Sequence, residues 1–102
     1  MQRTIHNKIE GEQIIHDNLI LHGMIIGKTT VAKGGNLELH GMIVGDLVLL
    51  PNSKVILRGM VNGDVINKGG ELNVFGMING DLIKQSGSTN VDPIAAINGK
   101  NI

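Results

Sequence analysis

The stretch HGMIVGDLVLLPNSKVILRGMVNGDV, residues 40–65, contains the phrase that decides the fold twice, as HGMIVGD at 40–46 and RGMVNGD at 58–64. The phrase recurs as HGMIIGK at 22–28 and FGMINGD at 75–81, which places the first glycines of the four copies at the nearly even positions 23, 41, 59 and 76. A period so short and constant, in a sequence without helical periodicity, is typical of a solenoid whose repeats each form one coil of a β-helix.

Within each repeat, aliphatic residues alternate with other side chains. In the second regular coil the odd positions hold Leu37, Leu39, Gly41, Ile43, Gly45, Leu47 and Leu49. A period of two predicts strands, with this odd set pointing inward. So short a repeat has room for three short strands. The sequence therefore predicts an all-β, single-stranded parallel β-helix, a solenoid of about five to six coils with a triangular section.

The repeat pattern also predicts how the chain is organised. We expect regular coils over residues 18–87, a degenerate coil or cap over 1–17, and a C-terminal coil or cap over 88–102. At the N terminus, Ile5 aligns with Leu21 and Ile9 with Ile25. At the C terminus, Thr89-Asn90-Val91 resembles Leu72-Asn73-Val74 before the pattern departs at Asp92-Pro93.

Composition excludes several classes of partner. The nine basic and nine acidic side chains cancel and are interspersed, so there is no basic stripe for a phosphate backbone and we expect no nucleic-acid partner. Cysteine is absent, which fits a reducing compartment. The N-terminal MQRTIHNK has no apolar signal region, and no apolar run is long enough to span a membrane. We expect a cytoplasmic protein.

The repeated Gly-Met-Ile/Val-x-Gly-Asp-Leu/Val phrase resembles the bactofilins, the polymer-forming cytoskeletal proteins of bacteria. The resemblance covers about residues 18–87, and GDL at 45–47, GDV at 63–65 and GDL at 80–82 carry most of it. It implies a right-handed parallel β-helix that polymerises end to end without nucleotide or cofactor and forms a scaffold. No membrane-targeting segment is visible, so membrane association is expected only through partners.

One column of equivalent positions holds His6, His22, His40, Arg58 and Phe75, stacked about 4.8 Å apart. Imidazoles on neighbouring strands can converge on zinc. However, the column changes to Arg58 and Phe75, and the sequence identifies no carboxylate to orient the rings. We therefore expect a solvated or partner-facing stripe, with no metal bound.

A second column, directly after a corner glycine, holds Lys28, Asp46, Asp64 and Asp81. Exposed carboxylates at strand spacing repel by only about 1 kcal/mol or less, so the column is tolerable. The alternatives are a bound cation or a general base, but catalysis usually needs a concave, partly dry site, which a flat wall does not offer. We expect these side chains to accept hydrogen bonds from backbone amides of the turns.

A third column holds Met24, Met42, Met60 and Met77, which point outward if the alternation continues through the corner. Methionine is flexible and polarizable, and contiguous exposed apolar area usually marks a protein partner. With Phe75, these methionines are the predicted partner surface. The alternative is that the corner reverses the alternation and buries them in the core.

The two ends of so short a rod form a large share of its surface. Terminal coils present unpaired strand edges and apolar cross-sections, so we expect self-assembly through Ile5 and Ile9 at one end and Val91 and Ile94 at the other. The predicted function is a homo-oligomeric or filamentous scaffold. The alternative is a small β-helix binding protein, of the immunity-type inhibitor or adaptor kind, that covers a protein partner with its flat apolar wall.

An enzyme is a third possibility. Aliphatic residues recur every six positions from Leu19 to Val61, a spacing similar to that of hexapeptide acyltransferases and β-helical carbonic anhydrases. Those enzymes need protruding loops, extra coils and trimer clefts that carry a histidine. Because no insertion here is long enough to form a lid, we expect no catalytic residues.

Overall fold

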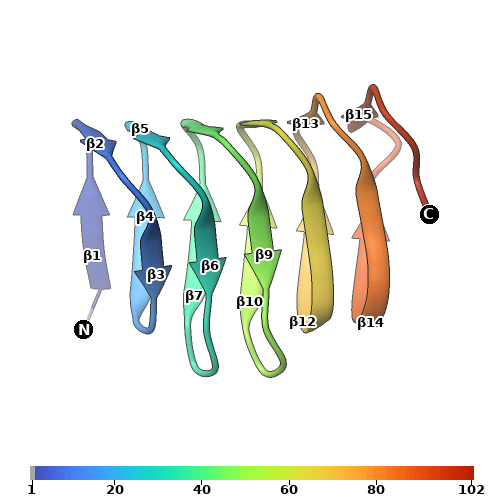
Figure 1. Cartoon of the computed structure of the whole chain (residues 1–102), viewed down its shortest axis with the longest axis horizontal. Helices are drawn as coiled ribbons and strands as arrows, with labels where there is room; N and C mark the ends of the chain where they lie inside the picture. Colours follow the sequence, from blue (N-terminus) through green and yellow to red (C-terminus); the bar gives the residue numbers. More distant parts are fainter. Residues whose placement is uncertain (1) are drawn as a thin grey trace.

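The computed structural model describes residues 2–102 as a rod of parallel strands with three walls, without a helix in this range (Figure 1). Wall one stacks β1 (Gln2–Ile5), β4 (Asn18–Leu21), β7 (Asn36–Leu39), β10 (Lys54–Leu57) and the second halves of β12 (Val65–Val74) and β14 (Leu82–Val91). Wall two stacks β2 (Lys8–Glu10), β5 (Met24–Ile26), β8 (Met42–Val44), β11 (Met60–Asn62), β13 (Met77–Ile78) and β15 (Ala96–Ile97). Wall three stacks β3 (Gln13–Ile15), β6 (Thr29–Val31), β9 (Leu47–Leu49) and the first halves of β12 and β14.

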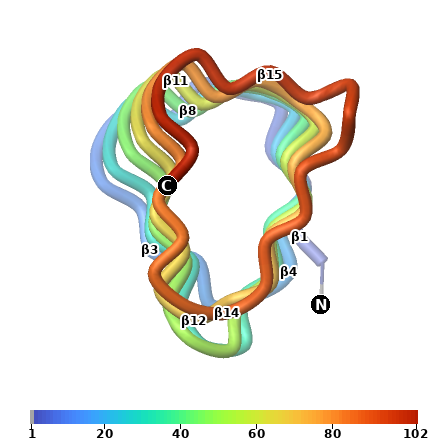
Figure 2. Tube along the Cα trace, turned by 90° about the vertical axis from the view of Figure 1, so that its right-hand side faces the viewer, coloured from blue at the N-terminus to red at the C-terminus, as the bar shows by residue number. Residues whose placement is uncertain are grey.

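These three walls confirm the predicted parallel β-helix. In Figure 1 the chain rises along the far wall, crosses the top and descends along the near wall as it advances toward the C terminus. Seen along the axis in Figure 2, each coil turns counterclockwise while it approaches the viewer. The winding is therefore right-handed. The Cα atoms extend 31 × 24 × 22 Å along the principal axes.

Strand pairing shows how the irregular first repeat fits the regular ones. On wall one, the first residues of successive strands pair in one column, which runs from Gln2 through Asn18, Asn36, Lys54 and Glu71 to Ser88. The step from Gln2 to Asn18 is the shortest in this column, yet it still closes a full turn of the chain. Residues 2–17 thus form a complete coil beneath β4, β5 and β6.

The core is a stack of aliphatic side chains at the inward positions of the strands. Within the described residues, the buried cluster is Ile15, Leu19, Leu21, Ile25, Val31, Leu37, Leu39, Ile43, Leu47, Leu49, Val55, Leu57, Val61, Val65, Leu72, Val74, Ile78 and Leu82. Most of these side chains have no exposed surface. Because each coil closes its core only against its neighbours, stability depends on contacts between adjacent coils.

The corner glycines differ from the sequence prediction that placed them among the inward residues. A Cβ added at Gly41 would overlap the carbonyl oxygen of Gly23 in the coil below. The missing side chain would therefore point along the rod axis, against the backbone, and not into the core. Glycine is required here because the stacked corners approach one another too closely for any side chain.

The corner between walls three and one is held by a buried polar side chain. Asn67 occupies the column of Val31 and Leu49, where an aliphatic residue would fit, and it is fully buried. Its Oδ1 accepts hydrogen bonds from the backbone N–H groups of Gly69 (3.1 Å) and Gly70 (2.8 Å), and its Nδ2 donates to the carbonyl oxygen of Gly70 at 3.1 Å. These bonds satisfy the amide and fix the turn that joins two walls into the long strand β12.

Candidate functional site

Wall two carries the predicted partner surface. Met24, Met42, Met60 and Met77 pair in direct register across β5, β8, β11 and β13. All four side chains are half-buried, whereas the next residue in each strand, from Ile25 to Ile78, is buried. The alternation therefore continues through the corner and the methionines face outward. The alternative, in which they are packed in the core, is wrong.

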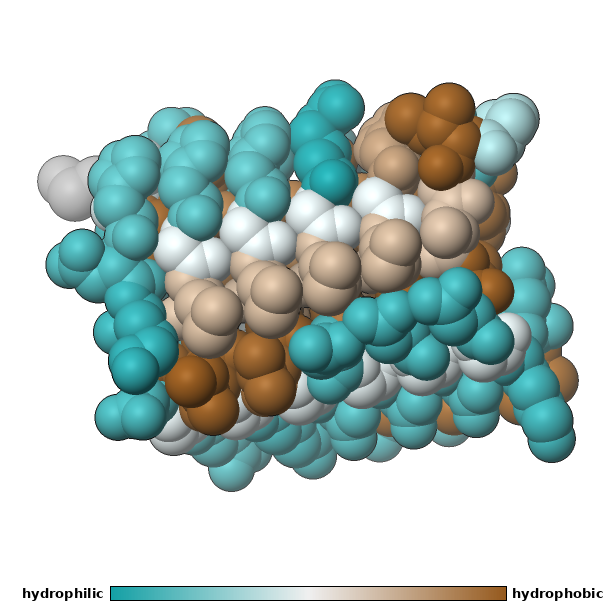
Figure 3. Space-filling view, turned by 90° about the horizontal axis from the view of Figure 1, so that it is seen from above, coloured by the Kyte–Doolittle hydropathy of each residue, from teal (hydrophilic) through white to brown (hydrophobic). Residues whose placement is uncertain are grey.

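The stripe beside the methionines changes character along the rod, as the space-filling view shows (Figure 3). It begins with the apolar side chains of Ile26 and Val44 and continues with three asparagines. Asn79 donates to Asn62 (2.5 Å between Nδ2 and Oδ1), and Asn98 donates to Asn79 (2.6 Å). The asparagines form a hydrogen-bonded ladder, which the sequence prediction did not include.

The histidine column lies on the other side of the methionines, across the corner glycines. The rings of His6 and His22 are stacked with centroids 5.1 Å apart, and those of His22 and His40 are 4.9 Å apart. The column ends in a cation–π contact, with Cζ of Arg58 at 4.8 Å from the ring centroid of Phe75. Phe75 is therefore placed beside the methionine stripe and is itself partly covered by Arg58.

A carboxylate does contact this column, contrary to the expectation from sequence. Glu38, on wall one, lies with Oε1 at 2.7 Å from Nε2 of His40. The two residues stand on either side of the inward Leu39, and both side chains are partly exposed. In residues 2–102, no group of three or more His, Cys, Asp or Glu side chains is arranged to hold a metal ion.

The methionine and histidine columns together line a shallow groove of about 600 Å³ along wall two. Its lining comprises His6, Asn7, Lys8, His22, Gly23, Met24, His40, Gly41, Met42, Gly59, Met60 and Met77. No carboxylate belongs to this lining, and Lys8 closes its N-terminal end. The groove is therefore a mainly apolar trough with imidazole edges.

The aspartate column has the turn role that its position predicted. Oδ1 of Asp46 accepts a hydrogen bond from the backbone N–H of Asp64 at 2.8 Å, and Asp64 accepts one from Asp81 at the same distance. Oδ1 of Asp81 in turn accepts from the backbone of Lys100 at 2.7 Å. Each carboxylate thus binds the amide at the equivalent position of the next coil.

The N-terminal end of the rod is an open edge. β1, β2 and β3 each pair with a strand on one side only. Ile5 and Ile9, in the first coil, are partly buried and pack against the core. They are therefore the apolar side chains that the end of the rod presents to water.

The C-terminal end, which faces the viewer in Figure 2, is an open edge as well. β15 ends its sheet, and β14 pairs with β12 on one side and meets only the chain end, through a bridge between Leu82 and Asn101, on the other. Val91 continues the inward column of Val74 and is 39% exposed. Ile97, which the sequence prediction did not include, continues the column of Ile78 and packs on the core.

Ile94 lies apart from this cross-section. It belongs to the turn of residues 92–95, in which Oδ1 of Asp92 accepts a hydrogen bond from the backbone N–H of Ile94 at 3.0 Å. The turn bulges beyond the outline of the preceding coils (Figure 2), and the side chain is 77% exposed. Of the four predicted assembly residues, Ile5, Ile9 and Val91 continue inward columns and Ile94 does not.

Wall three carries a second, mainly apolar stripe along the rod, which is interrupted by Thr30. Its column holds Ile14, Thr30, Val48, Ile66, Ile83 and Ile102. The two terminal members are the most exposed, with 57% for Ile14 and 61% for Ile102. Alignment of residues 1–17 and 88–102 with the regular coils is the signal that could have revealed both.

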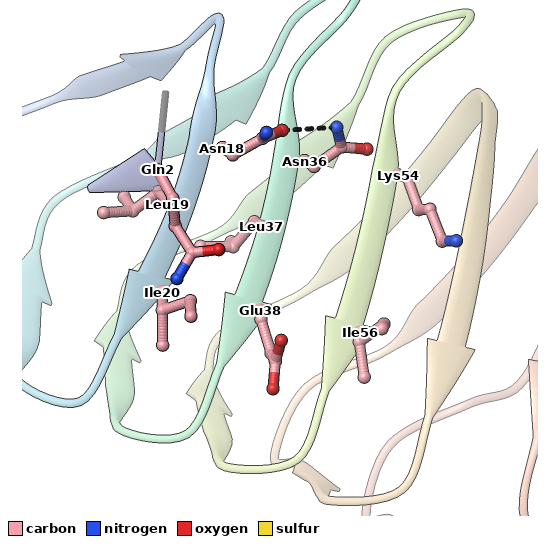
Figure 4. A pocket seen from close by; sticks show the side chains of 9 residues that line it. All are labelled: Gln2, Asn18, Leu19, Ile20, Asn36, Leu37, Glu38, Lys54 and Ile56. Atoms are coloured by element: carbon pink, nitrogen blue, oxygen red, sulfur yellow. Dashed lines mark hydrogen bonds between the residues drawn. The ribbon is translucent and has the colours of Figure 1, made fainter. Parts of the chain in front are cut away.

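Wall one is more polar. A shallow pocket of about 280 Å³ on its outer face is lined by Gln2, Asn18, Leu19, Ile20, Asn36, Leu37, Glu38, Lys54 and Ile56 (Figure 4). Nδ2 of Asn36 donates to Oδ1 of Asn18 at 2.6 Å, which forms another asparagine pair between coils. Lys54 and Glu38 extend over the face from neighbouring strands, so the pocket has no single charge.

Comparisons of the chain with protein-family models, with curated proteins and with solved structures found no match. Within residues 2–102, no helix is long and apolar enough to cross a membrane.

Proposed function

We propose that this protein is a self-assembling β-helix whose coils stack end to end without nucleotide, as a cytoplasmic scaffold or cytoskeletal polymer of the bactofilin type. The observation that carries the proposal is the pair of open ends. Each end exposes unpaired strand edges together with an apolar cross-section. A second copy stacked on an end would pair those edges and bury that area at once.

The columns of the two ends match in a head-to-tail arrangement. If the next copy continues the register of the walls, each wall brings an aliphatic side chain of one end over an aliphatic side chain of the other, at inward positions on walls one and two and in the outward stripe on wall three. These pairs are Val91 over Ile5 on wall one, Ile97 over Ile9 on wall two and Ile102 over Ile14 on wall three. Arg3, near the junction, is already paired with Asp17, so stacking would not leave the charge of Arg3 unpaired.

The proposal is tested by light scattering after size exclusion, together with negative-stain microscopy, on nucleotide-free protein. We expect wild type to form species that grow with concentration. Ile9→Lys and Ile97→Lys should each yield monomers that keep the β circular-dichroism spectrum, because the ammonium group can reach water at the open end of a monomer but would be buried in the junction. Ile56→Lys, on the outer face of wall one in a middle coil, is the matched control and should still assemble.

A wild type that stays monomeric at high concentration and low salt, with protected amides in β1 and β14, would contradict the proposal. The second candidate would then apply, a binding protein of the inhibitor or adaptor kind. It is favoured by the continuous row of outward methionines and by the groove beside them. This candidate predicts a discrete small species until a protein partner is added, and Met42→Asp should abolish partner binding without altering that species. For both candidates we propose a non-catalytic protein.

A further inference from the structure

We propose that His22, Met24, His40 and Met42 form a binding site for a soft monovalent metal ion, Cu(I) or Ag(I). The two histidines and two methionines come from adjacent coils. They line the same groove on wall two, where Met24 and Met42 are paired in register and the two imidazole rings stack at 4.9 Å.

The donor types select the class of ion. Thioether sulfur is a soft ligand that favours Cu(I), and imidazole also suits copper. Zinc and harder divalent ions are usually held with thiolate or carboxylate help, and no such group lines this groove. The groove also has Lys8 at one end, and Arg58 follows His40 in its column. A neutral donor set beside these positive charges disfavours a divalent ion more than a monovalent one, because the repulsion scales with the charge of the ion.

The contact between Glu38 and His40 supplies what a ligating histidine commonly has. Nε2 of His40 is at 2.7 Å from Oε1 of Glu38. This contact holds the ring and leaves Nδ1 as the free nitrogen. A carboxylate on the far nitrogen of a ligating histidine fixes the tautomer and raises the basicity of the ligand. Methionine has three rotatable bonds beyond the backbone, so the two sulfurs can adjust to imidazoles that are held in place.

The rod contains its own control for this site. The methionine column continues through Met60 and Met77, but the neighbouring column there holds Arg58 and Phe75, whose contact is a cation–π pair. In the first coil the opposite holds: His6 is present in the histidine column, but Lys8 occupies the position of the methionine. Imidazole and thioether therefore coincide only in the coils of His22 and His40 among residues 2–102.

The test is titration with Ag(I) nitrate in chloride-free, thiol-free buffer, followed by calorimetry and by NMR of ¹³C-labelled methionine methyl groups. We expect one equivalent to bind and to shift the methyl signals of Met24 and Met42, while those of Met60 and Met77 stay in place. Met24→Leu/Met42→Leu should weaken binding at least about tenfold, and Glu38→Gln by about 10-fold or more. The control Met60→Leu/Met77→Leu should stay within about twofold, because leucine conserves the volume of the side chain.

Three results would overturn the inference: no saturable binding at one equivalent, equal weakening by both methionine double variants, or equally tight binding of Zn(II). The site is on a side wall and not at the ends. Its presence is therefore independent of whether the protein assembles, and each variant is also examined for assembly so that the two proposals are judged separately.

Discussion

The carboxylate of Asp64 binds the backbone N–H of Asp81 in the next coil, with 2.8 Å between Oδ1 and the nitrogen. The same oxygen occupies the space that a side chain at position 80 would need, since a Cβ added to Gly80 would overlap it. The Gly-Asp pair is thus one device: the aspartate ties two coils together, and the glycine of the following coil makes room for it.

The first prediction follows from this device. Asp64→Ala should lower the free energy of unfolding by about 1–3 kcal/mol, because it leaves the partly buried amide of Asp81 without an acceptor. Asp64→Asn should cost less than about 1 kcal/mol, since the amide oxygen can keep the acceptor role. Urea unfolding measures both. Lys28→Ala is the control: Lys28 occupies the same column but its side chain offers no acceptor, so the change should stay within about 0.5 kcal/mol. Loss of a bound divalent ion together with assembly in Asp64→Asn would identify a cation site instead.

The second prediction concerns the corner glycines. Gly41→Ala should destabilise the protein by about 3 kcal/mol or more, because the new Cβ would overlap the backbone of Gly23, which is itself fixed by stacking. Gly34 has a φ of +81° but open space around the missing side chain. Gly34→Ala should therefore cost only the left-handed backbone penalty of about 1–2 kcal/mol. Thermal and urea unfolding would compare the two, and equal costs would mean that the corners can separate.

The third prediction tests the inward column. Leu39 has no exposed surface and lies between Leu21 and Leu57 of the adjacent coils. Leu39→Lys should abolish cooperative unfolding, because a charge cannot be buried there without a partner, and Leu39→Ala should cost about 2–5 kcal/mol. Ile56→Lys, on the outward face of the neighbouring strand, is expected to fold. A cooperative thermal transition in Leu39→Lys would show that the column can open.

Period and alternation were sufficient to predict the coils, the walls and the outward methionines, because both depend only on backbone geometry and on which side chains avoid water. Columns with one chemical type along their length, such as Leu21, Leu39 and Leu57, were therefore placed correctly. The same reasoning wrongly put Gly41 among the inward residues. The alternation keeps its phase from one wall to the next, but at the corner itself the missing Cβ points along the axis and not into the core.

Contacts that depend on side-chain conformation could not be predicted in this way. The sequence shows that Asn67 stands in an aliphatic column, but not that it folds back on the glycines of the following turn. It shows Glu38 two positions before His40, on the same outward side of the chain, but not that the carboxylate of Glu38 turns toward Nε2 of the ring. Ile97 and Ile102 were missed as end residues because the turn after β14 is longer than its counterparts and shifts the last coil out of the earlier spacing.

The last prediction concerns the pH dependence of the first coil. Arg3 donates two hydrogen bonds to Asp17, from Nε to Oδ2 at 2.6 Å and from the terminal nitrogen to Oδ1 at 2.9 Å. The hydrogen bonds from Arg3 hold the pKa of Asp17 below its usual value.

A lowered folded-state pKa adds stability that is present above the unfolded pKa of about 3.9 and is lost as the pH falls through the folded value. The melting temperature of wild type minus that of Asp17→Asn should therefore be constant from about pH 7 to 5 and shrink below about pH 4. Hydrogen exchange should place the loss in β1, the strand that Arg3 belongs to. A difference that is unchanged between neutral and acidic pH would mean that the pair is too well solvated to hold the open end of the rod.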